Sequence, residues 1–252
     1  MLYGGHIKAV EDIDYLRNFG FDLGEVIVRD KASRILWANS GITNQFDDDF
    51  FLIAHGPHEG APNDLNNLWN TYVPAITETI DIIERIGIGF LTMHLWMDPR
   101  FVKSTVLEEK KNALRRLVDY GRQHKVVISL ENLSECAADL EAVLNVIPDL
   151  AITLDVGHGQ LLAETNTSFE IIERVGSCIK HIHLHDNRGG SGVRDDLHLG
   201  IGNGIVDFPG ILSALIGRGY DGTVTLELEK DVIVAGRERI QRIIEWCCIP
   251  PV

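Results

Sequence analysis

Residues that can bind a divalent metal close six short apolar runs of this sequence. The runs are FFLIAH, FLTMH, VVISLE, AITLD, HIHLH and TVTLE, and they place His55, His94, Glu131, Asp155, His183 with His185, and Glu227 at their ends. A buried carboxylate is costly unless it is paired or bound to a metal, so six such endings are hard to explain as core polarity. The pattern therefore indicates a metal site made of carboxylate and imidazole ligands.

The mixed ligand set narrows the choice of metal. Carboxylates and imidazoles suit Mn²⁺, Zn²⁺, Co²⁺ or Fe²⁺ better than Ca²⁺, and Mg²⁺ remains open. No cysteine ends any of the six runs, so thiolates are absent from the candidate ligands, and the four cysteines form no CxxC motif. We interpret these cysteines as reduced thiols of a cytoplasmic protein: Cys136, Cys178, Cys247 and Cys248.

Four of the runs place a small hydroxyl residue two positions before the candidate ligand. They are Thr92-Met-His94, Ser129-Leu-Glu131, Thr153-Leu-Asp155 and Thr225-Leu-Glu227. Side chains two apart in a strand share a face, so each hydroxyl should lie below a ligand while Leu or Met points outward. We prefer Glu227 to Glu229 because Glu229 lies further out along the strand. His181, His183 and His185 share one face, and depth favours His183 as the ligand and a structural role for His181.

Eight apolar β-rich runs alternate with amphipathic stretches along the chain. The predicted strands lie near residues 2–6, 22–28, 50–55, 88–94, 125–131, 150–155, 180–185 and 223–229. Between them apolar residues recur at helical spacing, and glycines stand where such helices should end, at Gly87, Gly121, Gly176 and Gly219. Eight strands in 252 residues favour a single (β/α)₈ TIM barrel domain, residues 1–252, over an open doubly wound sheet. The carboxyl ends of its strands would meet at one mouth and bring the candidate ligands together.

The charge of the chain restricts its partners. With 37 acidic and 23 basic residues the net charge is −14, which gives no general attraction for nucleic acid or anionic lipid. A local basic groove or bound metal ions could still reverse the field at one site. No run of about 18 apolar residues predicts a membrane span, and the first residues lack the pattern of a signal peptide. We expect a cytoplasmic protein that acts on a small molecule, and the oligomeric state stays open, a homo-oligomer included.

Loops after the strands carry further polar residues. His158 closes the motif TLDVGH, and RDDLHLGIGNG supplies Asp195, Asp196 and His198 ahead of a glycine-rich turn. The turn matches no nucleotide-binding fingerprint, which favours a flexible loop over a phosphate cradle. Arg188 could anchor an anionic group of a substrate, or be a solvated loop residue.

Other polar residues carry weaker signals. We interpret His6, His58 and His124 as surface or loop histidines. Glu25 stands near the end of a short run and fits either the barrel mouth or a position without a role.

Taken together, the motifs SLEN, TLDVGH, KHIHLHDN, HLGIGNGIVDF and YDGTVTLELE resemble those of the xylose isomerase-like TIM barrels. This group joins sugar and sugar phosphate isomerases and epimerases with the endonuclease IV-type AP endonucleases. The resemblance covers most of the chain and implies a metal held by Glu131, Asp155, His183 and Glu227. In the ketose epimerases, the residues matching Glu131 and Glu227 also form an acid–base pair that moves a proton beside a carbonyl. The resemblance further implies substrate contacts from His158 and Arg188, and from His55 and His94, which recur in both branches.

The endonuclease branch uses three metals and a larger ligand set. Its counterparts here are His55, His94, Glu131, Asp155, His158, His183 and Glu227, with Asp196 and His198 as approximate matches for an Asp-x-His pair. Two departures speak against this branch. First, aligning the Asp-x-His pair with that branch requires a one-residue gap before the following glycine turn. Second, the loop GPHEGAPNDLNN carries no lysine, arginine or aromatic DNA-penetrating segment.

Three functional hypotheses follow, and the first is preferred. The chain is a metal-dependent isomerase or epimerase of a sugar, sugar phosphate or related polyol, which works by proton transfer through an enediolate. The alternative is an endonuclease IV-like multi-metal phosphodiesterase that acts on abasic DNA or a small phosphate ester. The third is a binding protein with a relict metal site, which an intact set of charged ligands disfavours.

Overall fold

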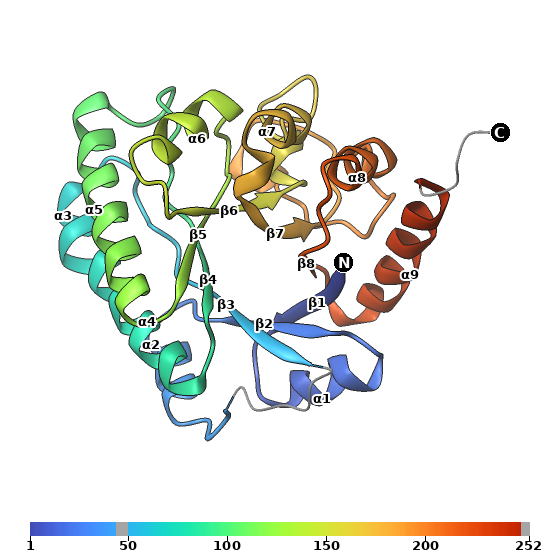
Figure 1. Cartoon of the computed structure of the whole chain (residues 1–252), viewed down its shortest axis with the longest axis horizontal. Helices are drawn as coiled ribbons and strands as arrows, with labels where there is room; N and C mark the ends of the chain where they lie inside the picture. The colour runs from blue at the N-terminus through green and yellow to red at the C-terminus, as the bar shows by residue number, and fades with distance from the viewer. Residues whose placement is uncertain (44–49, 248–252) are drawn as a thin grey trace.

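Eight parallel strands close into a barrel in the computed structural model, which describes residues 1–43 and 50–247 (Figure 1). Each strand pairs with the next along the chain, and β1 pairs with β8 to complete the ring. The strands are β1 Leu2–Ile7, β2 Leu23–Ile27, β3 Phe51–His55, β4 Phe90–Met93, β5 Val127–Glu131, β6 Ala151–Asp155, β7 Ile179–Leu184 and β8 Thr223–Leu226. All eight predicted strands are present, and the predicted (β/α)₈ architecture is confirmed.

Helices that follow the strands surround the barrel (Figure 1). They are α1 Glu11–Asn18, α2 Lys31–Ala38, α3 Leu65–Asn67, α4 Val73–Ile86, α5 Ser104–Gln123, α6 Ala137–Leu144, α7 Ser168–Val175, α8 Phe208–Gly217 and α9 Lys230–Cys247. α4 ends as predicted at Gly87, whose φ of 92° is the left-handed conformation that glycine adopts without strain. Gly121 does not end a helix, because α5 runs on to Gln123. A Cβ at Gly121 would lie 2.6 Å from the Val126 carbonyl oxygen, so this glycine lets α5 pack closely on the start of β5.

The alternation of inward and outward side chains follows the predicted parity. The residues between hydroxyl and ligand belong to the hydrophobic layer of the protein: Met93, Leu130, Leu154 and Leu226. On the inner face, the Thr153 hydroxyl lies 3.0 Å from that of Thr92 and 2.7 Å from that of Ser129. His181 joins this hydroxyl layer through contacts to Thr223 and Thr225, as its predicted structural role requires. The layer fills the barrel directly below the candidate ligands.

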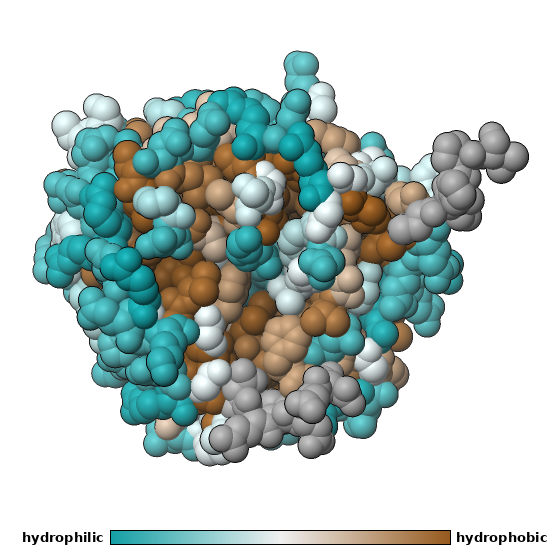
Figure 2. Space-filling model, in the orientation of Figure 1, coloured by the Kyte–Doolittle hydropathy of each residue, from teal (hydrophilic) through white to brown (hydrophobic). Residues whose placement is uncertain are grey.

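The opposite end of the barrel is apolar. A cavity of about 670 Å³ opens there among the first residues of the strands and is lined mainly by aromatic and aliphatic side chains such as Phe51, Phe90 and Val127. In Figure 2, hydrophobic residues gather at the centre of the molecule, inside a rim of hydrophilic helices. Within the described residues, no helix is long and apolar enough to cross a membrane. Cys136 and Cys178 form no disulfide in this part of the chain, and Cys248 lies outside it.

Candidate metal centre

The four principal ligand candidates converge from four adjacent strands. Nδ1 of His183 lies 3.1 Å from Glu227 Oε1, 3.4 Å from Glu131 Oε2 and 3.8 Å from Asp155 Oδ2. All four residues are buried, and neither His183 Nδ1 nor Glu131 Oε1 makes a hydrogen bond to the described residues. Three carboxylates facing one unsatisfied imidazole nitrogen form a donor set that fits a divalent transition metal.

In the metal-free protein, protons supply the positive charge of this site. Burial lowers the pKa of His183, but Glu25, Glu227 and Glu131 outweigh burial and hold that pKa well above its ordinary value. Burial likewise raises the pKa of Glu131, yet His94 and His183 hold it well below the usual range. A metal ion would take the place of these protons, because ligands must be deprotonated to coordinate it.

Two further histidines lie on the Glu131 carboxylate. Nε2 of His55 is 3.1 Å and Nε2 of His94 is 2.8 Å from Glu131 Oε2, so the three side chains form a second possible metal-binding group. The exposed loop residue His58 reaches back to this group, with its Nδ1 2.8 Å from Nδ1 of His94. His58 was predicted only as a surface or loop residue, and its contact with the site was missed.

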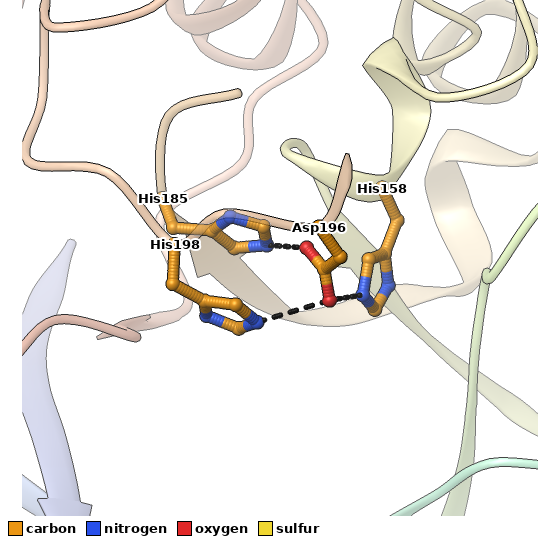
Figure 3. A group of neighbouring side chains, drawn as sticks. All are labelled: His158, His185, Asp196 and His198. Atoms are coloured by element: carbon orange, nitrogen blue, oxygen red, sulfur yellow. Dashed lines mark hydrogen bonds and ion pairs between the residues drawn. The ribbon is translucent and has the colours of Figure 1, made fainter. Parts of the chain in front are cut away.

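A third group lies beside the first (Figure 3). His158, His185 and His198 point toward the Asp196 carboxylate, and their donor atoms lie within 4.8 Å of one another. The His198 and His158 Nε2 atoms are 3.1 and 3.4 Å from Asp196 Oδ2. Burial lowers the pKa of His198, but the neighbouring Asp196 and Glu227 carboxylates raise it to about 9. The sequence places His185 at a strand end among the metal-competent residues, but it does not indicate that His185 joins this cluster.

The glycine-rich turn positions Asp196 and His198 and does not form a phosphate cradle. The backbone N–H groups of Gly202 and Gly204 both donate to the buried Asp186 carboxylate at 2.8 Å, so they are not available to a ligand. His198 has a φ of 45°, an uncommon conformation for a residue other than glycine. Such strain persists only where the surroundings impose it, as this anchored loop does.

The mouth of the barrel contains a cavity of about 150 Å³ over these groups. Its lining residues are His6, Ile27, Arg29, His55, Gly56, His58, His94, Glu131, His158, Asp196, His198 and Glu227. Arg188 is exposed and does not belong to this lining, whereas Arg29, just after β2, does. His6 was expected to be a surface or loop histidine, but it belongs to β1 and its Nε2 lies 2.9 Å from Glu227 Oε1. His124 lies outside the cavity and contacts Glu84, as expected of a surface histidine.

A family model matches nearly the whole chain. The family model described as "Xylose isomerase-like TIM barrel" matches residues 13–248. Among curated proteins, an uncharacterized protein of Methanocaldococcus jannaschii is 32% identical in an alignment of 133 residues that covers 49% of this chain and 44% of that protein. The matched part therefore spans less than half the length of this relative.

Solved structures share the fold at low sequence identity. A D-tagatose 3-epimerase-like protein superposes with a TM-score of 0.76 at 20% identity and covers 98% of each chain. An L-ribulose 3-epimerase has a TM-score of 0.73 at 17% identity, with 98% of this chain and 95% of that chain covered. The IOLI protein with a binding zinc atom has a TM-score of 0.75 at 14% identity, with 98% and 99% covered.

Proposed function

Because the chain belongs to the xylose isomerase-like TIM barrel family, we propose that it is a metal-dependent isomerase or epimerase of a sugar, sugar phosphate or related polyol. The observation that carries this proposal is the pair of glutamates on either side of His183. Glu131 and Glu227 approach the same His183 nitrogen, at 3.4 and 3.1 Å, from different strands. Two carboxylates that share a metal position can also face a substrate bound to that metal.

In the proposed mechanism the two glutamates move a proton. A bound divalent ion would polarise the substrate oxygens and stabilise an enediolate. One glutamate, as the carboxylate, takes the proton from the carbon beside the carbonyl. The other must carry a proton at that point and returns it to the substrate, so the two groups exchange protonation states in each turnover. Neighbouring histidines hold both groups in place, since His94 contacts Glu131 at 2.8 Å and His6 contacts Glu227 at 2.9 Å.

The structural neighbours support a version of this chemistry on ketoses. Two of them are named as 3-epimerases or 3-epimerase-like, and their fold matches this chain over almost its full length. The zinc atom of the IOLI structure makes zinc the first metal to test. We further infer that residues 1–252 work as a single domain, since the eight strands form one ring.

A multi-metal phosphodiesterase is the second candidate, and the cluster in Figure 3 favours it. His158, His185, Asp196 and His198 add a complete donor group next to the principal site. Enzymes with two or more metals use them to hold both the attacking and the leaving oxygen of a phosphate ester. The net charge of −14 opposes a DNA substrate in particular.

One experiment separates the two candidates. The purified protein would be analysed for bound metal, reloaded with that metal, and offered a panel of ketoses and their phosphates together with DNA that contains an abasic site. We expect one ion per chain and interconversion of one sugar pair. Three ions per chain with cleavage of abasic DNA would contradict the isomerase proposal.

Arg29 is expected to bind the end of the substrate furthest from the metal. It lines both the mouth cavity and an adjoining polar cavity of about 400 Å³, which also contains Lys31 and Asn70. Arg29→Ala should raise KM about 10-fold or more for a phosphorylated substrate with little change in kcat, as loss of a charged contact of ~1.5–3 kcal/mol predicts. Arg188→Ala is the matched control, because its exposed side chain lies off the cavity. A larger KM effect from Arg188→Ala would show that the anion anchor is Arg188 after all.

A further inference from the structure

Glu25 is a fully buried carboxylate in the middle of β2 whose nearest titratable neighbours are histidines. Its Oε2 lies 3.1 Å from Nε2 of His183, 3.6 Å from Nε2 of His181 and 3.9 Å from Nε2 of His6. Removing a carboxylate from water costs several kcal/mol unless strong partners compensate. The acid–base chemistry proposed above gives this residue no part, so its burial requires another explanation.

The two nitrogens of His183 have different surroundings. Nδ1 faces the carboxylates of Glu131, Asp155 and Glu227, whereas Nε2 faces Glu25. A metal ion bound at Nδ1 leaves the only ring proton on Nε2. That N–H is buried and needs an acceptor, and a Glu25 oxygen stands 3.2 Å away.

We propose that Glu25 is a positioning residue for the metal centre, which fixes the tautomer and orientation of His183 by accepting its Nε2 proton in a hydrogen bond. The inference rests on the proposed metal-binding role of the site. A carboxylate behind a ligating imidazole also makes that imidazole a stronger donor to the metal. Glu25 therefore contributes to metal affinity without touching the metal.

The contacts of His181 argue that Glu25 positions His183 and does not itself bind a metal. Its Nδ1 lies 2.7 Å from the Thr223 hydroxyl and its Nε2 lies 3.0 Å from the Thr225 hydroxyl. Both nitrogens are thus engaged by the hydroxyl layer, which leaves neither free for a metal shared with Glu25 and His183. The carboxylate supports the site from below, inside the barrel, rather than forming a second site there.

The test is a Zn²⁺ titration of the metal-free full-length protein against a competing chelator. Relative to the parent, Glu25→Ala should bind the ion about 10- to 100-fold more weakly, and Glu25→Gln should lose less because its amide oxygen still accepts the hydrogen bond. Glu135→Gln is the matched control: Glu135 is equally buried but accepts backbone N–H groups of Met97 and Leu133, away from the centre. We expect this control to bind Zn²⁺ as tightly as the parent.

A second measurement reports on the His183 ring itself. In the Co²⁺-loaded parent, the Nε2 proton of His183 should give a strongly shifted, slowly exchanging NMR signal, which Glu25→Ala should broaden or remove. Zn²⁺ affinity of Glu25→Ala within twofold of the parent would overturn the inference, as would an equal loss in Glu135→Gln. If Glu25→Ala binds one ion fewer per chain than the parent, Glu25 is itself a metal ligand, and the positioning role is refuted. A parent protein that binds no divalent ion would refute the proposed function together with this inference.

Discussion

Glu227→Gln is expected to lower kcat by about 10²- to 10⁴-fold, the usual contribution of a group that transfers a proton in the transition state. The side chain is buried at the mouth, and its Oε1 is 2.9 Å from His6 and 3.1 Å from His183. Burial raises the pKa of Glu227, but His183 and His6 hold it well below its ordinary value, so the group is a carboxylate at neutral pH. Glutamine keeps the shape and removes the ability to accept a proton. Steady-state kinetics on the substrate found in the sugar panel would measure the effect.

Glu229→Gln is the matched control for this substitution. It lies two residues further along, with a side chain that is 79% exposed and 3.3 Å from Lys8, and its kcat should equal that of the parent. Metal analysis of Glu227→Gln distinguishes a lost base from a lost ion. If the variant keeps its metal and turns over within tenfold of the parent, the two-glutamate mechanism is wrong. Glu131→Gln should behave like Glu227→Gln.

The parts of this site that could be predicted from the sequence belong to regular strands. Period-two alternation located the ends of β5, β6 and β8, and with them Glu131, Asp155 and Glu227. The same alternation predicted the hydroxyl layer below, because a one-residue slip would have turned every ligand toward the helices. For this reason the proposed carboxylate ligands could be predicted from the sequence.

Residues of β1 and β2 were harder to recognise. The β1 strand contains two glycines, which weaken its apolar signal, and a Cβ at Gly4 would lie 2.5 Å from the Leu23 side chain. The glycines allow β1 to pack closely against its neighbour, and they obscure the fact that His6 faces the mouth. Glu25 stands in the middle of β2 rather than at its end, so the strand-end argument did not apply to it.

Loop residues were predicted least well, because loops have no periodicity that relates position to direction. Arg188 and Arg29 both follow strands, yet only Arg29 lines the mouth cavity. The placement of His198 depends on Asp186, whose carboxylate binds the amides of the glycine-rich turn. This contact between distant residues could not be derived from spacing alone.

Removal of the metal is the second large effect that we expect. Dialysis against a chelator should reduce turnover to background, and addition of the same ion should restore it, since the proposed chemistry depends on the ion. A ligand at 100 times its Kd stabilises a fold by ~2.7 kcal/mol. For a protein of this size that corresponds to a fall in Tm of roughly 5–10 °C on chelation, measured by calorimetry or circular dichroism. Activity that survives removal of all detectable metal would exclude a metal-dependent mechanism.

The pH dependence of metal rebinding to the metal-free protein should show whether one group of ligands or several groups bind an ion. Protons compete with the ion for each histidine, so the apparent affinity rises with pH until the pH passes the pKa of the metal-free group. In the cluster of Figure 3 the pKa of His198 is raised to about 9, so an ion bound there should gain affinity between pH 7 and 9. If the parent shows a second binding step, His198→Ala should abolish that step and leave the first unchanged, because the proposed principal ligands are His183 and three carboxylates. A titration with one step in both proteins would support a single-metal isomerase and weigh against the multi-metal phosphodiesterase.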